Sequence, residues 1–165
     1  MDVNLPKFQE EYSAKIPALT LLHNLGWSFL SPEESLAARG GKTSEVVLRN
    51  ILRDELRKRR FSYGGQERPY SDSSIENVIS ELCLPALNEG LGVANEKIYN
   101  HLLYGIAVKE FIDGKRVSPT LHIIEWGDVQ NNSFVFTEEL KVQRIGGVEH
   151  RIPDIVCFVN GLPLA

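Results

Sequence analysis

The C-terminal stretch of the chain carries the residues whose types and spacing could do chemistry. Asp154 stands directly before an apolar run, residues 155–159, which is typical of a buried strand. The pair Asn160-Gly161 follows, and it favours a two-residue type I′ hairpin turn, because both central positions of that turn need a positive φ. We therefore expect the chain from Leu162 onward to return antiparallel, so that residues just beyond Ala165 would lie beside Asp154.

A carboxylate at the entrance of such a hairpin is a candidate metal ligand. Carboxylates gathered on paired strands can hold Mg²⁺ between themselves and a phosphate, and Asp154 would be the first of them. The plainer alternative is that Asp154 only begins the strand and is solvated, and the local pattern leaves both open. The hairpin stops within the apolar run 162–165 without a polar tail, so we expect the chain to be a piece of a longer protein.

Three other stretches imitate functional motifs. The basic run Arg57-Lys58-Arg59-Arg60 could contact the DNA backbone, although cations at the C-terminal end of a helix are also favoured by the helix dipole. Glu139-Leu140-Lys141 is a Glu-x-Lys triplet, but it precedes Asp154, and we expect an exposed strand of alternating charge there. Gly40-Gly41-Lys42-Thr43 resembles the end of a phosphate-binding loop, yet it lacks the earlier glycine and a leading strand.

The composition of the chain limits the number of domains and the classes of protein to which it could belong. The 165 residues are 42% hydrophobic and 24% charged, which suits a single globular domain over residues 1–165. The formal net charge of -4 argues against a module that holds DNA by overall positive charge, but it does not exclude a nuclease. Cys83 and Cys157 are expected to be buried free thiols, and neither belongs to a zinc-binding pattern.

The order of apolar patterns predicts a mixed α/β fold. Residues 1–104 are expected to be mainly helical and residues 105–165 mainly strands, forming a largely antiparallel sheet flanked by helices. The patterns predict helices over 17–25, 44–60, 73–84 and 95–104, loops over 31–42 and 62–72, and strands over 106–108, 111–112, 121–126, 134–136 and 155–159.

The sequence contains no recognisable export signal. The first residues lack a basic region followed by an apolar run, and no later segment is apolar enough to cross a membrane. We therefore expect a cytoplasmic protein without a membrane partner.

The motif around Asp154 resembles that of a known enzyme family. The stretch 151–164, Arg-x-Pro-Asp-Ile-Val-x-Phe-Val-Asn-Gly-Leu-Pro-Leu, is similar to the nuclease motif of the restriction (R) subunits of type I restriction enzymes, which are members of the PD-(D/E)xK nuclease superfamily. Pro153-Asp154 matches the "PD" of that family. In the family the turn runs on into a strand carrying Glu-x-Lys, a triplet that would begin here just beyond Ala165.

Weaker similarity extends towards the N-terminus. The family has Gln-Phe where Glu139-Leu140 stand, and acidic helix residues are common at the positions of Lys15 and Pro17, so the resemblance implies no metal-assisting carboxylate on the first helix. The matching residues outside the motif are Asn95 to Tyr99, Leu103 to Gly105, Leu121 to Trp126, Asn131 to Phe134, and Glu11 with Leu22, Gly26 and Trp27.

The resemblance implies both a fold and a mechanism. It implies a restriction-endonuclease-like core, cut within the hairpin that follows the Pro-Asp strand. The parent protein would cleave double-stranded DNA endonucleolytically with Mg²⁺, after translocation driven by ATP bound in motor domains outside this chain. Asp154 would be catalytic and a metal ligand, and the partners would be DNA and the specificity and methylation subunits. Without its Glu-x-Lys, the present chain is expected to be inactive.

Two alternatives remain open from the sequence. The chain could be a non-enzymatic docking module of a larger DNA-processing complex, or it could be part of another PD-(D/E)xK nuclease that acts in repair or recombination. Metal binding that depends on Asp154 would favour a nuclease, whereas no effect of metal would favour the docking module.

Overall fold

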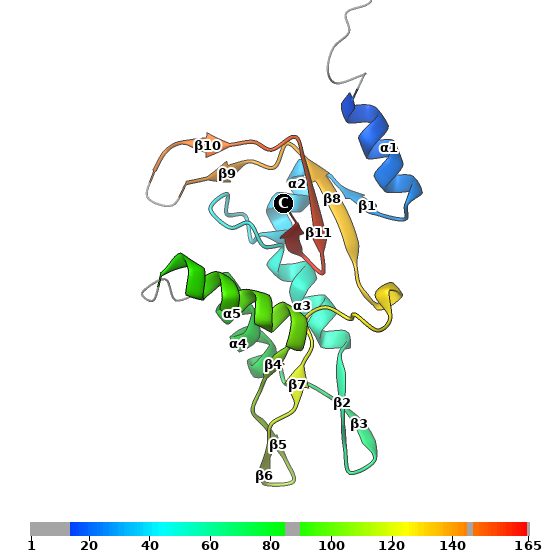
Figure 1. Ribbon diagram of the computed structural model, residues 1–165, viewed down its shortest axis with the longest axis vertical. Coiled ribbons are helices and arrows are strands. Elements are labelled where there is room, and N and C mark those ends of the chain that lie inside the picture. The colour runs from blue at the N-terminus through cyan, green and yellow to red at the C-terminus, as the bar shows by residue number, and fades with distance from the viewer. Residues whose placement is uncertain (1–13, 85–89, 145–146, 165) are drawn as a thin grey trace, which may run out of the picture.

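A four-stranded sheet forms the upper part of the molecule (Figure 1). The computed structural model describes residues 14–84, 90–144 and 147–164, so Glu11 of the N-terminal resemblance lies outside the described residues. The sheet has the order β1-β8-β11-β12, in which β1 runs parallel to β8 and the other neighbours are antiparallel. Its strands are β1 (Ser28–Leu30), β8 (Phe134–Glu138), β11 (Ile155–Val159) and β12 (Leu162–Leu164).

Helices α2 (Pro32–Ala38) and α3 (Arg49–Lys58) cover one face of this sheet. Val135 of β8 and Phe158 of β11 pair directly, and both point into a cluster with Leu48, at the start of α3. The side chains of Leu48 and Phe158 are fully buried. Burial of large side chains of this kind stabilises the fold by about 1.5–3 kcal/mol each, so this cluster fixes β11 against the helices.

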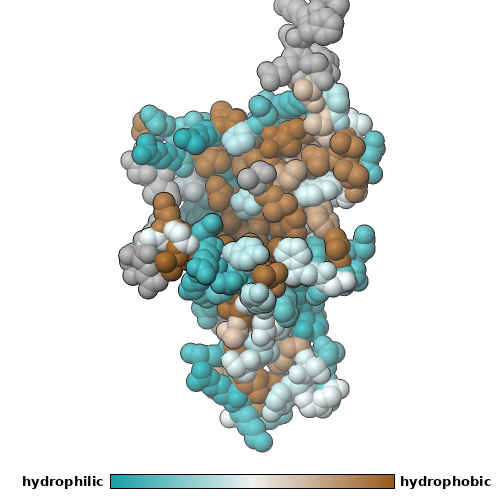
Figure 2. Space-filling view, viewed as in Figure 1, coloured by the Kyte–Doolittle hydropathy of each residue, from teal (hydrophilic) through white to brown (hydrophobic). Residues whose placement is uncertain are grey.

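Helix α1 (Ile16–Asn24) lies beside β1 and contains no buried residue. The rings of Trp27, which follows α1, and of Phe29 in β1 reach the other face of the sheet. Trp27 meets Phe134 at 5.2 Å and Phe29 meets Phe136 at 5.4 Å between ring centroids. Figure 2 shows apolar side chains gathered on the surface over this part of the molecule. Helix α1 itself therefore packs on the rest of the protein without fully burying any of its residues.

A second, larger core lies below the sheet. Helix α3 contributes Leu52 and Leu56 to it, so α3 takes part in both cores. Ion pairs from Arg53 to Glu76 and from Arg57 to Asp72 (3.0 Å) also join α3 to α4. The other elements of this region are α4 (Asp72–Cys83), α5 (Leu91–Tyr104), β4 (Ile106–Ala107) and β7 (Thr120–Leu121).

Three hairpins project from the two cores. Two of them lie at the lower end in Figure 1, whereas the third leaves the sheet between β8 and β11. Their strands are β2 (Arg60–Tyr63) with β3 (Gln66–Pro69), β5 (Glu110–Ile112) with β6 (Lys115–Val117), and β9 (Val142–Gln143) with β10 (His150–Arg151).

The predicted Asn160-Gly161 turn is confirmed, with φ angles of 51° and 82°, but it is buried. The Asn160 amide donates to the carbonyl oxygen of Ile123 and to Oδ1 of Asn132, both at 2.8 Å, and its own Oδ1 accepts the N–H of Ser133 at 2.7 Å. The carbonyl of Gly161 accepts the N–H of Leu48 at 2.8 Å. One turn therefore joins β11 and β12 to the start of α3 and to the segment that leads into β8.

Several predicted boundaries were wrong. Residues 31–42 were expected to be a loop, but Ser31 and Glu34 form a capping box that begins α2. Residues 62–72 were also expected to be a loop, yet most of them form the β2–β3 hairpin, which turns at Gly64-Gly65. The helix predicted from Ser44 begins only at Arg49, because Leu48 is held by Gly161 in a non-helical conformation.

The predicted mixed α/β class with mainly antiparallel strands is confirmed, and it is consistent with a restriction-endonuclease-like core. The α-helices that the structure describes all precede Gly105, whereas β1, β2 and β3 were not predicted. The parallel pair β1–β8 spans most of the chain, which local patterns do not reveal. Within residues 14–84, 90–144 and 147–164, no helix combines the length and the apolar character that crossing a bilayer requires.

Gly161→Ala should be much more destabilising than Gly114→Ala, although both glycines follow a residue with positive φ in the same kind of turn. A Cβ at Gly161 would lie 2.6 Å from the carbonyl oxygen of Leu48, whereas a Cβ at Gly114 meets nothing within 4 Å. We expect Gly114→Ala to lower the free energy of unfolding by about 1–2 kcal/mol, from its left-handed backbone alone. Gly161→Ala should lower it by about 1–3 kcal/mol more. Urea denaturation measures both, and equal losses would contradict a tightly packed turn.

Asn160→Ala should lower the free energy of unfolding by about 3 kcal/mol, because it strands the buried N–H of Ser133 and the carbonyl of Ile123. The exposed Asn77 of α4 gives a matched control. Asn77→Ala should change stability by no more than about 0.5 kcal/mol. Thermal and urea unfolding of both variants would check this, and similar stabilities for the two would show that the buried amide contributes little.

Candidate active site

Asp154 occupies the entrance of β11, at the edge where β8 ends. Its side chain is exposed, and its backbone carbonyl accepts the N–H of Glu139 at 3.1 Å. The next pair along the ladder joins Ile155 to Glu138. The structure thus presents the Asp154 carboxylate to solvent, next to the end of a strand that carries two further carboxylates.

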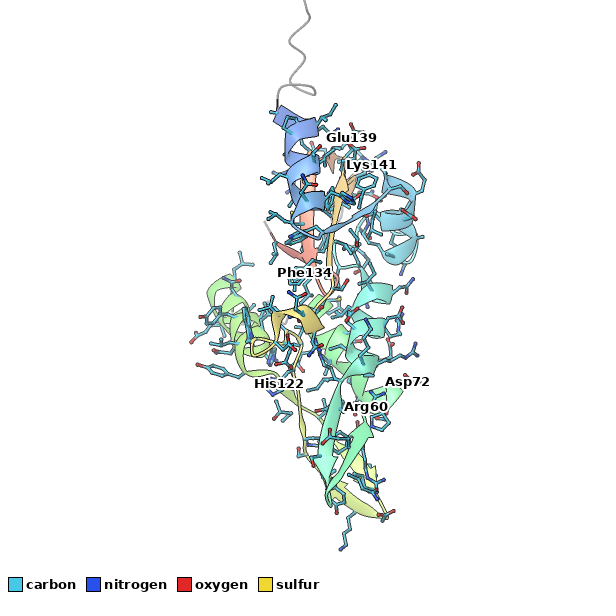
Figure 3. All side chains as sticks on the ribbon, turned by 90° about the vertical axis from the view of Figure 1, so that its right-hand side faces the viewer. Arg60, Asp72, His122, Phe134, Glu139 and Lys141 are labelled. Carbon is cyan, nitrogen blue, oxygen red and sulfur yellow. The ribbon has the colours of Figure 1, made fainter. Side chains whose placement is uncertain are left out.

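A single lysine that precedes α1 pairs with both of these carboxylates and offsets part of their charge. The Nζ atom of Lys15 lies 2.8 Å from Oε2 of Glu138 and 3.1 Å from Oε1 of Glu139. Hydrogen bonds to Glu138 and then to Glu139 raise the pKa of the Lys15 ammonium, so this group stays charged. In Figure 3, Glu139 lies near the N-terminal end of α1. A cation contributed by the first helical segment therefore offsets the negative charge of the end of β8.

Residues 139–141 were predicted to be an exposed strand of alternating charge; the alternating exposure is confirmed, but the strand β8 ends at Glu138. Glu139 and Lys141 are exposed while Leu140 is buried, which gives the expected alternation. No hairpin between this triplet and Asp154 was predicted. The β9–β10 hairpin brings Glu139 to Asp154, because the Glu139–Asp154 backbone bond closes its base. The short strands of this hairpin carry no apolar alternation that would have predicted them.

The described residues do not by themselves compose a magnesium site. Among residues 14–84, 90–144 and 147–164, no group of three or more His, Cys, Asp or Glu side chains is placed to hold a metal ion. Asp154 supplies one carboxylate, and Lys15 already binds Glu138 and Glu139. Any metal held here would need ligands in addition to these.

The basic run at residues 57–60 lies away from Asp154, with Arg60 in the lower half of Figure 3. Arg57 pairs with Asp72 and Asp54, and Lys58 pairs with Glu55. Arg59 donates to the carbonyl of Asn131 and to Oδ1 of Asn132, and Arg60 donates to the carbonyls of Arg57 and Arg59. Each of these cations thus has a partner within the chain, and the structure does not bring the run together with Asp154. Its contact with DNA stays a prediction.

The remaining candidates have structural surroundings. Gly40-Gly41 follows helix α2, not the strand that a phosphate-binding loop requires, and Thr43 bonds to Gln143. Cys83 and Cys157 are free but only half-buried, and burial raises the pKa of both thiols.

A hydrogen-bond network that local sequence patterns did not predict connects three distant segments. Asn132 accepts from Asn160 and Arg59 and donates to the carbonyl of Glu125 at 2.8 Å. Both asparagines belong to stretches that carry the family resemblance, so the signal was present as a motif. Nothing in the local pattern, however, indicated that the two stretches contact each other or Arg59.

The sequence of the chain matches a known protein family. Residues 7–165 match the family described as the N terminus of the type I restriction enzyme R protein. The chain is 32% identical over 157 residues to the type I restriction enzyme HindI endonuclease subunit of Haemophilus influenzae, covering 90% of this chain and 14% of that protein.

Two relatives from Methanocaldococcus jannaschii are more distant or shorter matches. The putative type I restriction enzyme MjaIXP endonuclease subunit is 23% identical and covers 96% of this chain and 15% of its own length. The putative MjaVIIIP endonuclease subunit is 29% identical and covers 87% of this chain and 12% of its own length. The chain therefore spans about one seventh of the length of the curated relatives it matches. With nearly all of its residues matched, the chain belongs to the family of type I restriction enzyme R protein N termini.

Proposed function

We propose that this chain is the N-terminal part of the restriction subunit of a type I restriction–modification enzyme. In this proposal the longer protein cleaves double-stranded DNA endonucleolytically, and Asp154 contributes to the catalytic centre. The placement of Asp154 carries the proposal, because an exposed carboxylate stands at a strand entrance within the matched family region. The relatives named endonuclease subunits support the same function.

The register of the last hairpin indicates which later residue would lie opposite Asp154 and could supply a second carboxylate. Leu164 pairs with Cys157, and each step forward along β12 is one step back along β11. In a longer polypeptide that kept this register, the third residue after Leu164 would face Asp154. A Glu-x-Lys triplet carried there would bring a carboxylate and an ammonium group to the same edge.

Mg²⁺ is the proposed cofactor of that site. It would be held by Asp154 together with carboxylates beyond the described residues, and it would polarise the phosphate and lower the pKa of an attacking water. Within this chain, Lys15 offsets the charge of Glu138 and Glu139, which reduces repulsion of a phosphate that approaches Asp154. The buried turn after Val159 holds the other end of β11 in place.

The rest of the proposed machinery lies outside this chain. ATP would bind motor domains of the longer protein and drive DNA translocation before cleavage. DNA sequence would be read by a specificity subunit that acts together with methylation subunits. The formal net charge of -4 agrees with this division, because a segment that receives DNA from partners need not hold it by overall positive charge.

The 165-residue chain should not cleave DNA. Asp154 is a single carboxylate where phosphodiester hydrolysis with Mg²⁺ needs several ligands. Incubation with supercoiled plasmid and Mg²⁺ at high protein excess should leave the plasmid intact, as judged by agarose gel electrophoresis. Nicking that follows the protein through purification, and that disappears in Asp154→Asn, would overturn this expectation.

A longer version that includes the Glu-x-Lys triplet should gain Mg²⁺ binding that depends on Asp154. We expect Mg²⁺ to raise the Tm of the longer protein and to produce nicking, and both effects should be lost in Asp154→Asn. Asp113→Asn is the matched control, because Asp113 is exposed at the remote tip of the β5–β6 hairpin. A control variant that also loses both effects, or an Asp154→Asn variant that keeps both, would contradict a metal site at Asp154. An unchanged Tm in every variant would favour a docking module.

A further inference from the structure

The β9–β10 hairpin is a basic projection next to Asp154. Residues 141–152 contain three Lys or Arg and one Glu, so the formal charge of this segment is +2 in a chain of net charge -4. Lys141, Arg144 and Arg151 are all exposed. The hairpin leaves the sheet after Glu139 and re-enters it at Asp154, as Figure 1 shows between β8 and β11. Arg151 therefore lies three residues before the candidate catalytic carboxylate, whereas Arg144 lies farther out along the hairpin.

The base of this hairpin is fixed to the body of the protein. Gln143 donates its N–H to the carbonyl of Thr43 at 3.0 Å, and the buried side chain of Arg39 donates to the carbonyl of Lys141, also at 3.0 Å. The N–H of Arg144 donates to the carbonyl of Glu149 at 3.0 Å. Cations presented from an ordered backbone bind a ligand at a smaller entropic cost than those on a loose tail.

A hollow of about 650 Å³ opens beside the hairpin, lined by Val142, Arg144, Glu149, His150 and Arg151. The carboxylate of Glu149 lies 3.9 Å from Arg144, but both side chains are about four-fifths exposed, so this pair is weak. Arg151 makes no side-chain hydrogen bond or ion pair with the residues that the structure describes. Two guanidinium groups are thus available to an anion at this hollow.

We propose that the β9–β10 hairpin is a clamp for the DNA backbone, in which Arg144 and Arg151 bind phosphates that flank the one presented to Asp154. This inference rests on the proposed nuclease function and adds the residues that hold its substrate. A two-stranded ribbon fits the groove of a DNA duplex, and guanidinium groups bind phosphate oxygens in pairs. The basic run at residues 57–60 is the weaker candidate, because the structure does not bring it together with Asp154.

A pair of matched double variants tests the clamp. Arg144→Ala/Arg151→Ala removes two positive charges from the β9–β10 hairpin. Lys115→Ala/Arg116→Ala removes two from the β5–β6 hairpin, whose side chains are equally exposed but lie at the opposite end of the molecule (Figure 1). Both variants change the net charge by the same amount. A general electrostatic effect would therefore weaken DNA binding equally in the two.

The measurement is fluorescence anisotropy of a labelled DNA duplex, titrated with the 165-residue chain in EDTA at about 50 mM salt and above. The unmodified chain should bind, and Arg144→Ala/Arg151→Ala should weaken binding by about tenfold. The slope of log K against log salt should fall in magnitude by about 1.8, which corresponds to two lost phosphate contacts. Lys115→Ala/Arg116→Ala should stay within about twofold of the unmodified chain. Arg144→Lys/Arg151→Lys should keep most of the salt slope, and circular dichroism should show that every variant is folded.

Three results would overturn the clamp: no binding by the unmodified chain, equal losses in the two double variants, or no loss in Arg144→Ala/Arg151→Ala. Because EDTA removes metal, this assay does not depend on catalysis. Normal binding together with a longer protein that neither binds Mg²⁺ nor cleaves DNA would refute the nuclease proposal. Cleavage that persists without the two arginines would refute only the clamp.

Discussion

The buried turn at Asn160-Gly161 is the constraint on which the rest of the structure depends. A hairpin turn normally lies in solvent, where its backbone groups bind water. Here the Asn160 side chain and the Gly161 carbonyl bind the backbone of three other segments, at Ile123, Ser133 and Leu48. Because an unpaired polar group in the interior costs about 1–3 kcal/mol, each of these bonds is needed once the turn is buried. The strand that carries Asp154 is consequently held at its far end by the protein core.

Close packing at Gly161 and polar pairing at Asn160 act together. The backbone of α3 approaches Gly161 so closely that no side chain fits between them. That contact sets the start of α3, and α3 in turn takes part in both hydrophobic cores. Asn132 extends the same network to Arg59, which explains why a cation in a conspicuously basic run points inward. The position of β11, and with it that of Asp154, is therefore coupled to the lower part of the molecule.

Whether a charged side chain has a partner within the chain tells more about its role in this protein than the net charge does. The basic run at residues 57–60 is the densest in the sequence, yet carboxylates and backbone carbonyls within the chain hold its members. The exposed arginines of the β9–β10 hairpin are fewer and scattered in sequence, and the fold gathers Arg144 and Arg151 at one hollow. Lys15, by contrast, pairs with the two glutamates at the end of β8 and offsets part of their charge. Such pairing depends on side chains far apart in the chain, so the sequence pattern alone could not assign these roles.

The sequence by itself determined the local elements whose cause is local: the strand 155–159, the helices around Leu52 and Ile75, and the two positive-φ turns at Asp113-Gly114 and Asn160-Gly161. It also contained the capping signal at Ser31 that begins α2, in a stretch predicted to be a loop. Only the tertiary structure decided that one of two nearly identical turns is exposed and the other buried, and that Glu139 lies across from Asp154. The physical reason is that φ preferences and caps depend on neighbouring residues. Burial, strand pairing and ion pairing depend on which distant segments come into contact. Here those contacts result from the packing of β11 and its turn against α3.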